Sequence, residues 1–138
     1  MTTAEIYQPC FRYMIVDDGL VHLKGIQHLV NKALTELERP FICDMVESGA
    51  RAIEMCAQNT YHFVIMDQNM PQMSGAEATK MILNSKPDIY IIGCTASTDP
   101  KDIQDCIDAG MKKVLPKDYK QVAEFVKRIV PGMMAEHA

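Results

Sequence analysis

Five side chains that can do chemistry stand at or just beyond the ends of apolar stretches. They are Asp17, Asp18, Asp67, Thr95 and Lys117. Three carboxylates in one place would repel one another, raise one another's pKa and cost stability unless a cation compensated. Magnesium takes oxygen ligands and is typically held by one or two carboxylates together with a phosphate. If the fold brings the five together, they predict a divalent-metal site with a hydroxyl and an ammonium beside it.

Each of these residues alone has an ordinary structural explanation. An aspartate at the end of a strand is usually a turn former or a helix cap. Thr95 could likewise be a cap, and Lys117 could be a solvated surface charge. A functional site is favoured over these structural roles only because all five residues are expected at the same place in the fold.

Five short apolar runs have the length and flanks of buried strands. They are Tyr13–Val16, Phe41–Val46, Phe63–Met66, Ile89–Gly93 and Val114–Leu115. Apolar residues at helical spacing recur between and after these runs. This alternation, with short connections, predicts an α/β protein in which helices cover both faces of a mostly parallel sheet. Right-handed crossovers then place all strand C-termini at one edge, where open sheets of this kind bind ligands.

Start and stop signals define several of the helices. Ser74 opens an S-x-x-E capping box, and Asp99-Pro100 supplies a cap acceptor and a first-turn proline. Gly110 is expected to end its helix in the left-handed conformation. The last helix is expected near residues 120–130, with Pro131-Gly132 as its end.

The bulk composition fits one ordinary globular domain. The chain has 138 residues, 48% of them hydrophobic, and its net charge of −4 argues against a nucleic-acid surface. Five cysteines without a C-x-x-C pair predict reduced, structural thiols. With no 18-residue apolar run and no signal-peptide pattern, we expect a soluble, cytoplasmic protein. The expected boundaries are a flexible lead over 1–11, one domain over 12–131 and a tail over 132–138.

Four motifs at matching spacing resemble the receiver domain of two-component response regulators. They are Asp17-Asp18, Asp67-x-x-Met70-Pro71-x-Met73-x-Gly75, Thr95-Ala96 and Lys117. The resemblance covers roughly residues 12–130, and the segment around Asp67 is most similar to receivers of hybrid histidine kinases and phosphorelays. It implies a flavodoxin-like (βα)5 fold, a doubly wound parallel five-stranded sheet with strand order 2-1-3-4-5.

The resemblance also implies how a phosphoryl group and a metal would be bound. Asp67 would be the nucleophile that takes a phosphoryl group from a phosphohistidine and becomes an aspartyl phosphate. Asp18, Asp67 and the backbone carbonyl of Asn69 would coordinate Mg²⁺, or Mn²⁺ in its place. Asp17 would reach the ion through water, and the metal would offset charge during transfer.

Residues from the last two strands are implied to bind the phosphoryl group and to switch. Lys117 would pair with Asp67 at rest and with a phosphoryl oxygen afterwards. Thr95 would move its hydroxyl to the phosphoryl group, with the backbone amide of Ala96 beside it. Val114 departs from the family, in which many members carry an aromatic residue that rotates inward with the threonine. This departure puts that coupling in question and assigns the output to the loop after the fourth strand.

Two further departures flank the site. Asp118 replaces the proline that usually follows the lysine, in a bond that is commonly cis in the family. A cis bond before a non-proline residue costs about 2.5–4 kcal/mol, so we predict a trans Lys117–Asp118 bond and a shifted loop. Gly19 follows the acid pair where a side chain is common, which predicts wider access beside the metal.

The implied function is that of a phosphoryl-accepting switch in a His–Asp phosphorelay. Such a protein is not an independent enzyme, since it catalyses only its own phosphorylation and slow autodephosphorylation. The implied partners are a histidine kinase or histidine phosphotransfer protein, and a downstream protein on the fourth helix, fifth strand and fifth helix. We expect a monomer or weak dimer without direct nucleic-acid contact or membrane insertion. The start at Met1 favours a stand-alone regulator, while a fragment of a larger protein stays open.

Two other functions are compatible with part of the pattern. A degenerate receiver used as a docking module would share the fold, but all five site residues are retained here. A Mg²⁺-dependent phosphohydrolase with an aspartate nucleophile usually places a second acid two residues later. That position holds Asn69, which cannot do proton work at neutral pH.

Overall fold

Strands and helices alternate regularly along the chain. The computed structural model describes residues 11–38 and 40–136, so the predicted lead before Phe11 and the last two residues of the predicted tail lie outside the described residues. The strands are β1 (Phe11–Val16), β2 (Phe41–Val46), β3 (Phe63–Met66), β4 (Tyr90–Thr95) and β5 (Lys113–Pro116). The helices are α2 (Leu20–Thr35), α3 (Gly49–Gln58), α4 (Gly75–Ser85), α5 (Pro100–Ala109) and α6 (Tyr119–Glu136).

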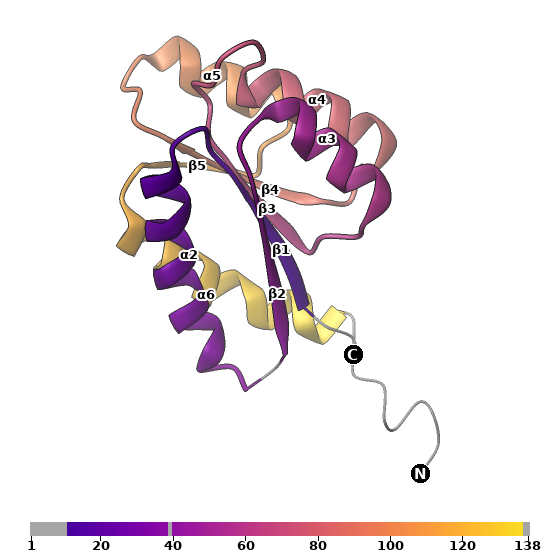
Figure 1. The fold of residues 1–138 in the computed structure, drawn as a ribbon, viewed down its shortest axis with the longest axis vertical. Helices are drawn as coiled ribbons and strands as arrows, with labels where there is room; N and C mark the ends of the chain where they lie inside the picture. Colours follow the sequence, from indigo (N-terminus) through magenta and orange to yellow (C-terminus); the bar gives the residue numbers. More distant parts are fainter. Residues whose placement is uncertain (1–10, 39, 137–138) are drawn as a thin grey trace.

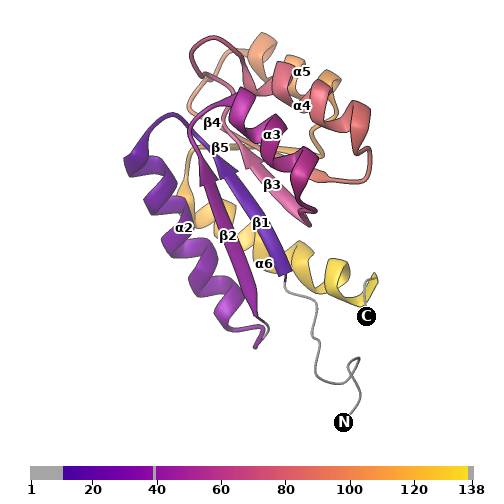
Figure 2. The same ribbon diagram turned by 45° about the vertical axis from the view of Figure 1, so that its right-hand side comes forward.

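The five strands form one parallel sheet in the order β2-β1-β3-β4-β5 (Figures 1 and 2). This confirms the predicted fold class and strand order. Because all strands run in the same direction, their carboxyl ends meet at one edge of the sheet. Within the described residues, no helix combines the length and apolar character needed to cross a membrane.

Helices cover both faces of the sheet, as predicted. α2 and α6 lie on one face, and α3, α4 and α5 lie on the other (Figure 1). Successive side chains of β1 point to opposite faces: Tyr13 and Ile15 join the core under α2 and α6, while Met14 and Val16 join the core on the other side. Burial on both faces explains why the strands are continuous apolar runs rather than alternating ones.

Three predicted helix signals are confirmed. The Ser74 hydroxyl accepts a hydrogen bond from the Glu77 amide at 3.1 Å, and so caps α4. The Asp99 carboxylate caps α5 by accepting from the Lys101 amide at 2.9 Å. Gly110 ends α5 with a φ of 111°, in the left-handed region that favours glycine.

The predicted end of the last helix at Pro131-Gly132 is wrong, because α6 continues through Pro131 to Glu136. Proline removes one backbone donor inside a helix and is normally unfavourable there. Here Val130 is fully buried, and Met133 and Met134 pack partly buried against the same core. This packing offsets the local cost. The domain boundaries at residues 12 and 131 stay a prediction.

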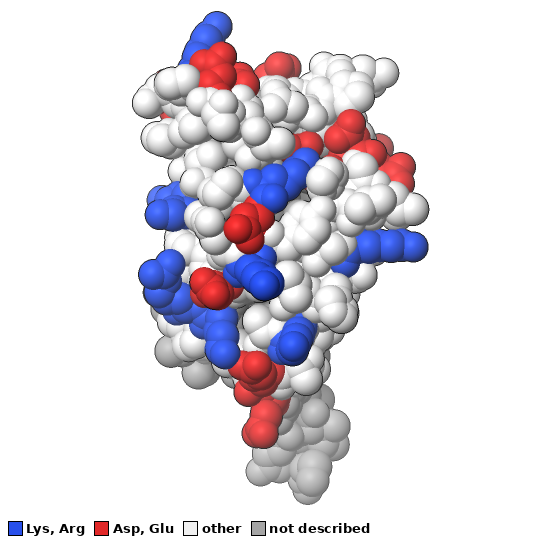
Figure 3. Space-filling view, turned by 90° about the vertical axis from the view of Figure 1, so that its left-hand side faces the viewer, with Lys and Arg blue, Asp and Glu red and all other residues white. Residues whose placement is uncertain are grey.

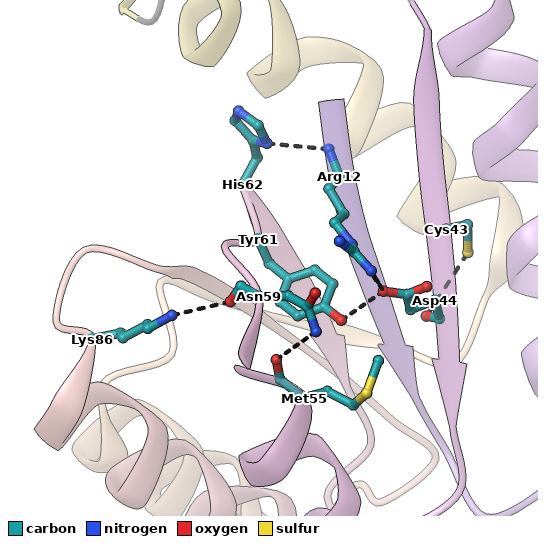
Figure 4. Close-up of polar contacts among 8 residues, drawn as sticks. All are labelled: Arg12, Cys43, Asp44, Met55, Asn59, Tyr61, His62 and Lys86. Atoms are coloured by element: carbon teal, nitrogen blue, oxygen red, sulfur yellow. Dashed lines mark hydrogen bonds and ion pairs between the residues drawn. The ribbon is translucent and has the colours of Figure 1, made fainter. Parts of the chain in front are cut away.

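A polar network joins the strands away from their carboxyl ends (Figure 4). The Asp44 carboxylate on β2 accepts from the Arg12 guanidinium at 2.8 and 3.0 Å and from the Tyr61 hydroxyl at 2.6 Å. These bonds connect β1, β2 and the segment before β3, and none of the predicted site residues takes part. The network therefore stabilises the sheet and is not part of the candidate site.

Candidate active site at the carboxyl edge of the sheet

The strand register brings the two central acids together. Val16 of β1 pairs with Met66 of β3, so Asp17 and Asp67 follow neighbouring positions at the edge. The Asp67 amide donates to the Val16 carbonyl at 2.9 Å, which extends the β1–β3 pairing to the acid itself. Asp67 is thus held by backbone bonds at the point where its side chain leaves the sheet.

Three carboxylates converge as the sequence predicted. One oxygen each from Asp17, Asp18 and Asp67 lies within 4.8 Å of the other two. Asp17 and Asp67 are buried, whereas Asp18 is exposed. The cluster therefore has two acids anchored inside the fold and one at the solvent boundary.

Lys117 from the loop after β5 is the cation of the site. Its ammonium lies 2.9 Å from Asp17 Oδ2 and 3.4 Å from Asp67 Oδ1. The resemblance implied a resting pair with Asp67 and overlooked the nearer partner, Asp17. Strand order brings these groups to one edge, but it does not say which carboxylate the lysine approaches more closely.

The charges of the site shift the ionisation of two groups. Burial, together with the neighbouring Asp17 carboxylate, raises the pKa of Asp67 to about 6, although Lys117 opposes the shift. Burial by itself lowers the pKa of Lys117, but the Asp17 and Asp67 carboxylates outweigh it and raise that pKa overall. One ammonium therefore does not neutralise the acidic cluster.

The donor set fits a hard divalent cation. Asp17 Oδ1 accepts from the Gly19 amide at 2.8 Å, while Oδ2 is buried and meets Lys117 as an ion pair without the alignment of a hydrogen bond. An under-satisfied buried carboxylate oxygen next to two more carboxylates is chemistry that suits Mg²⁺, which prefers oxygen ligands. Asp17, Asp18 and Asp67 are the residues that could hold the ion.

Thr95 lies buried at the end of β4, and its hydroxyl is engaged by the following loop. It accepts from the Ser97 amide at 3.1 Å, and the Asn69 side-chain amide approaches it at a long 3.5 Å. The Ser97 hydroxyl in turn donates to Asp102 of α5 at 2.6 Å. A chain of contacts therefore leads from Thr95 to the first turn of α5, while Ala96 is exposed beside it.

The loop after Asp67 is shaped by a close backbone approach at Gly75. The Gly75 amide donates to the Gln68 carbonyl at 2.9 Å, and a Cβ on Gly75 would lie 2.1 Å from the Asp67 carbonyl oxygen. Only glycine fits this contact. Gln68, which no sequence motif singles out, accepts from the Ala76 amide through its side-chain oxygen at 2.8 Å and holds the start of α4 to the loop.

The peptide bond after Lys117 has the predicted trans geometry. No cis peptide bond occurs in the described residues, so the Lys117–Asp118 bond is trans. Asp118 accepts from the amides of Lys120 and Gln121 at 3.0 and 3.2 Å, which makes it the cap of α6. An aspartate directly before a helix is a capping signal, so Asp118, which stands in the place of the usual proline, also starts α6.

The strand order and the acidic edge define a flavodoxin-like α/β protein with a candidate metal site. The family model of the response regulator receiver domain matches residues 13–129. The chain therefore belongs to the response regulator receiver domain family, which makes it a signalling domain of two-component systems rather than a classical enzyme.

Curated relatives cover both single-domain and much longer proteins. The chain is 31% identical over 128 residues to a nitrate/nitrite response regulator homolog of Haemophilus influenzae, covering 91% of this chain and 59% of that protein. It is 28% identical to the chemotaxis protein CheY of Thermotoga maritima, over 86% of this chain and 96% of CheY. It is 29% identical to hybrid signal transduction histidine kinase B of Dictyostelium discoideum, covering 79% of this chain but 6% of that kinase.

Solved receiver structures share the fold at low identity. A signal receiver domain from Pseudomonas fluorescens superposes with a TM-score of 0.78 at 21% identity, covering 92% of this chain and 99% of that one. The receiver domain of sensor histidine kinase PA1611 from Pseudomonas aeruginosa superposes with a TM-score of 0.75 at 21% identity, covering 89% and 99%. The latter structure holds a magnesium ion coordinated in its active-site cleft.

Proposed function

We propose that this chain is a phosphorylatable switch in which Asp67 accepts a phosphoryl group from a phosphohistidine. The donor would be a histidine kinase or a histidine phosphotransfer protein. The observation that carries the proposal is the placement of a buried Asp67 beside Asp17, Asp18 and Lys117 at the carboxyl edge of the sheet. Membership of the receiver family supports it.

In the proposed transfer, an Asp67 carboxylate oxygen attacks phosphorus while the phosphorus–nitrogen bond of the donor breaks. The electron pair of that bond stays on the imidazole nitrogen of the donor. Lys117, which already lies 3.4 Å from Asp67, is placed to pair with the added phosphoryl oxygens. Mg²⁺, or Mn²⁺ in its place, would be held by Asp18, Asp67 and the Asn69 carbonyl, with Asp17 reaching it through water, and would offset the negative charge of the site. In this proposal the chain turns over no separate substrate and loses its own phosphoryl group slowly to water.

The proposed switch begins at Thr95. In the proposal its hydroxyl, which now accepts from the Ser97 amide at 3.1 Å, moves to donate to a phosphoryl oxygen. Because Ser97 also contacts Asp102 of α5, this movement would reach the face formed by α5, β5 and α6. That face is the proposed contact for a downstream protein. Val114 lies half-buried on β5 and offers no aromatic ring to couple with Thr95.

The surface charge supports a protein partner rather than a nucleic acid. On the face shown in Figure 3, basic and acidic side chains are interspersed and do not form a uniformly basic area. A groove between α2 and α6 has this mixed character, with Lys127 and Glu36 forming an ion pair at 2.5 Å. We propose a cytoplasmic monomer or weak dimer without direct nucleic-acid contact.

A small-molecule donor tests the proposal. The protein is incubated with acetyl phosphate and Mg²⁺, and its intact mass is measured. We expect one added phosphoryl group, lost in Asp67→Asn and in metal-free buffer. Absence of any adduct would overturn the proposal in favour of a docking module. Steady phosphate release from diverse esters would instead indicate a hydrolase.

A further inference from the structure

His22 and Tyr119 form a second connection between the two loops of the site. His22 lies in the first turn of α2, and Tyr119 is the first residue of α6. The Tyr119 hydroxyl lies 2.5 Å from His22 Nδ1, and the two rings meet edge to face with their centroids 6.0 Å apart. Because α2 follows Asp17 and Asp18, and α6 follows Lys117, this contact links the acidic loop to the loop that carries the cation.

The Tyr119 ring packs closely against α2 at Gly25. A Cβ at Gly25 would lie 2.4 Å from Cε2 of the ring, so any other residue at this position would displace it. Glycine inside a helix is unfavourable relative to alanine, and here its missing side chain admits the ring. Gly25 fixes the ring against the helix, and His22 fixes the hydroxyl.

Backbone bonds and a helix cap hold the loop around Lys117 on the β4 and α6 sides. The Lys117 amide donates to the Thr95 carbonyl at 3.0 Å, which secures its backbone on the β4 side. The next residue is Asp118, which lacks the fixed φ that a proline would supply. On the α2 side, Tyr119 of the same loop contacts His22.

We propose that Tyr119 and His22 are positioning residues that hold the Lys117 ammonium over Asp17 and Asp67. This inference rests on the proposed function, because phosphoryl acceptance is the reaction in which Lys117 takes part. Neither residue belongs to the acidic cluster. Loss of their contact should therefore slow the transfer while leaving Mg²⁺ affinity unchanged.

The test measures phosphorylation rate and Mg²⁺ affinity separately. With acetyl phosphate as donor, no partner docking contributes to the rate. We expect Tyr119→Phe to slow adduct formation about three- to tenfold, the range that one net hydrogen bond represents. His22→Leu should do the same. His22→Asn keeps a polar side-chain atom near the position of Nδ1 and should restore much of the rate.

Two other tyrosines provide matched controls. The hydroxyl of Tyr13 donates to Asn31, and that of Tyr61 donates to Asp44 (Figure 4), each at 2.6 Å and away from the site. Tyr13→Phe and Tyr61→Phe should lower the melting temperature about as much as Tyr119→Phe does, with the wild-type rate. Equal slowing in all three variants, or none in Tyr119→Phe, would overturn the inference.

A failure of the proposed function is recognised separately. If the wild type takes no phosphoryl group, the phosphoacceptor proposal fails, and amide hydrogen exchange then decides the positioning role. Faster exchange of the Lys117 amide in Tyr119→Phe, but not in Tyr13→Phe, would support that role. Unchanged exchange would overturn it.

Discussion

Replacement of Asp67 by asparagine should make the metal-free protein more stable at neutral pH. The ionised Asp67 carboxylate is buried and lies next to the Asp17 carboxylate, and these effects outweigh the attraction of Lys117. Asparagine has nearly the same shape without the charge. The variant therefore removes the unfavourable charge and leaves the packing in place.

The size of the effect follows from the pKa of Asp67, which is about 6 in the folded protein against an ordinary value of 3.8. A proton is thus bound more tightly by the folded state than by the unfolded state. The stability that protonation provides is full below pH 4 and is lost as the pH rises to about 6. A difference of roughly two pH units corresponds to about 3 kcal/mol. For a domain of this size that is roughly 10 °C in melting temperature.

Urea unfolding between pH 3 and 8 in buffer with a chelator measures this effect. We expect wild type and Asp67→Asn to have similar free energies of unfolding at pH 3, and the variant to be more stable by up to about 3 kcal/mol above pH 6. The exposed Asp88 is the matched control, and Asp88→Asn should follow the wild type throughout. A variant no more stable than wild type at pH 7.5 would refute the reasoning.

Three other expectations concern the metal and the backbone. Mg²⁺ should raise the wild-type melting temperature by mass action and raise that of Asp18→Asn less; equal shifts in thermal scans would contradict a role for Asp18 in binding the ion. Gly75→Ala should lower the free energy of unfolding in urea by about 1–3 kcal/mol through its clash with the Asp67 carbonyl. Gly132 has open space around it, so Gly132→Ala should leave the free energy of unfolding unchanged or raise it by up to about 1 kcal/mol. A lower free energy of unfolding in Gly132→Ala would contradict the steric explanation for Gly75. Pro131→Ala should raise the melting temperature, because it restores a helix donor inside α6; a lower melting temperature would show that the proline is favourable there.

The fold and the membership of the acidic cluster could be predicted from sequence because both depend on order along the chain. Once β1 and β3 are adjacent parallel strands, Asp17 and Asp67 must share an edge whatever their exact distance. The nearer approach of Lys117 to Asp17 depends on differences of half an ångström between side chains. No spacing rule reports such a difference.

Other features were missed because tertiary packing decides them. Proline normally ends a helix. Here α6 continues past Pro131 because Val130 and the methionines after it pack against the core. The contact between His22 and Tyr119 joins residues 97 positions apart. The one local sign of this contact is Gly25, a glycine inside a helix, where glycine is normally unfavourable. Only the packing of the Tyr119 ring against it explains the choice.

The instability expected at Asp67 is connected to the proposed function. Lys117 lies closer to Asp17 than to Asp67, so the proposed acceptor keeps a charge that its surroundings compensate only in part. A bound cation would relieve the repulsion in this cluster and so stabilise the state that is ready to react. Asparagine relieves the same repulsion permanently and abolishes the proposed nucleophile. A more stable Asp67→Asn protein that accepts no phosphoryl group would therefore show that the Asp67 carboxylate serves the proposed chemistry at the expense of stability.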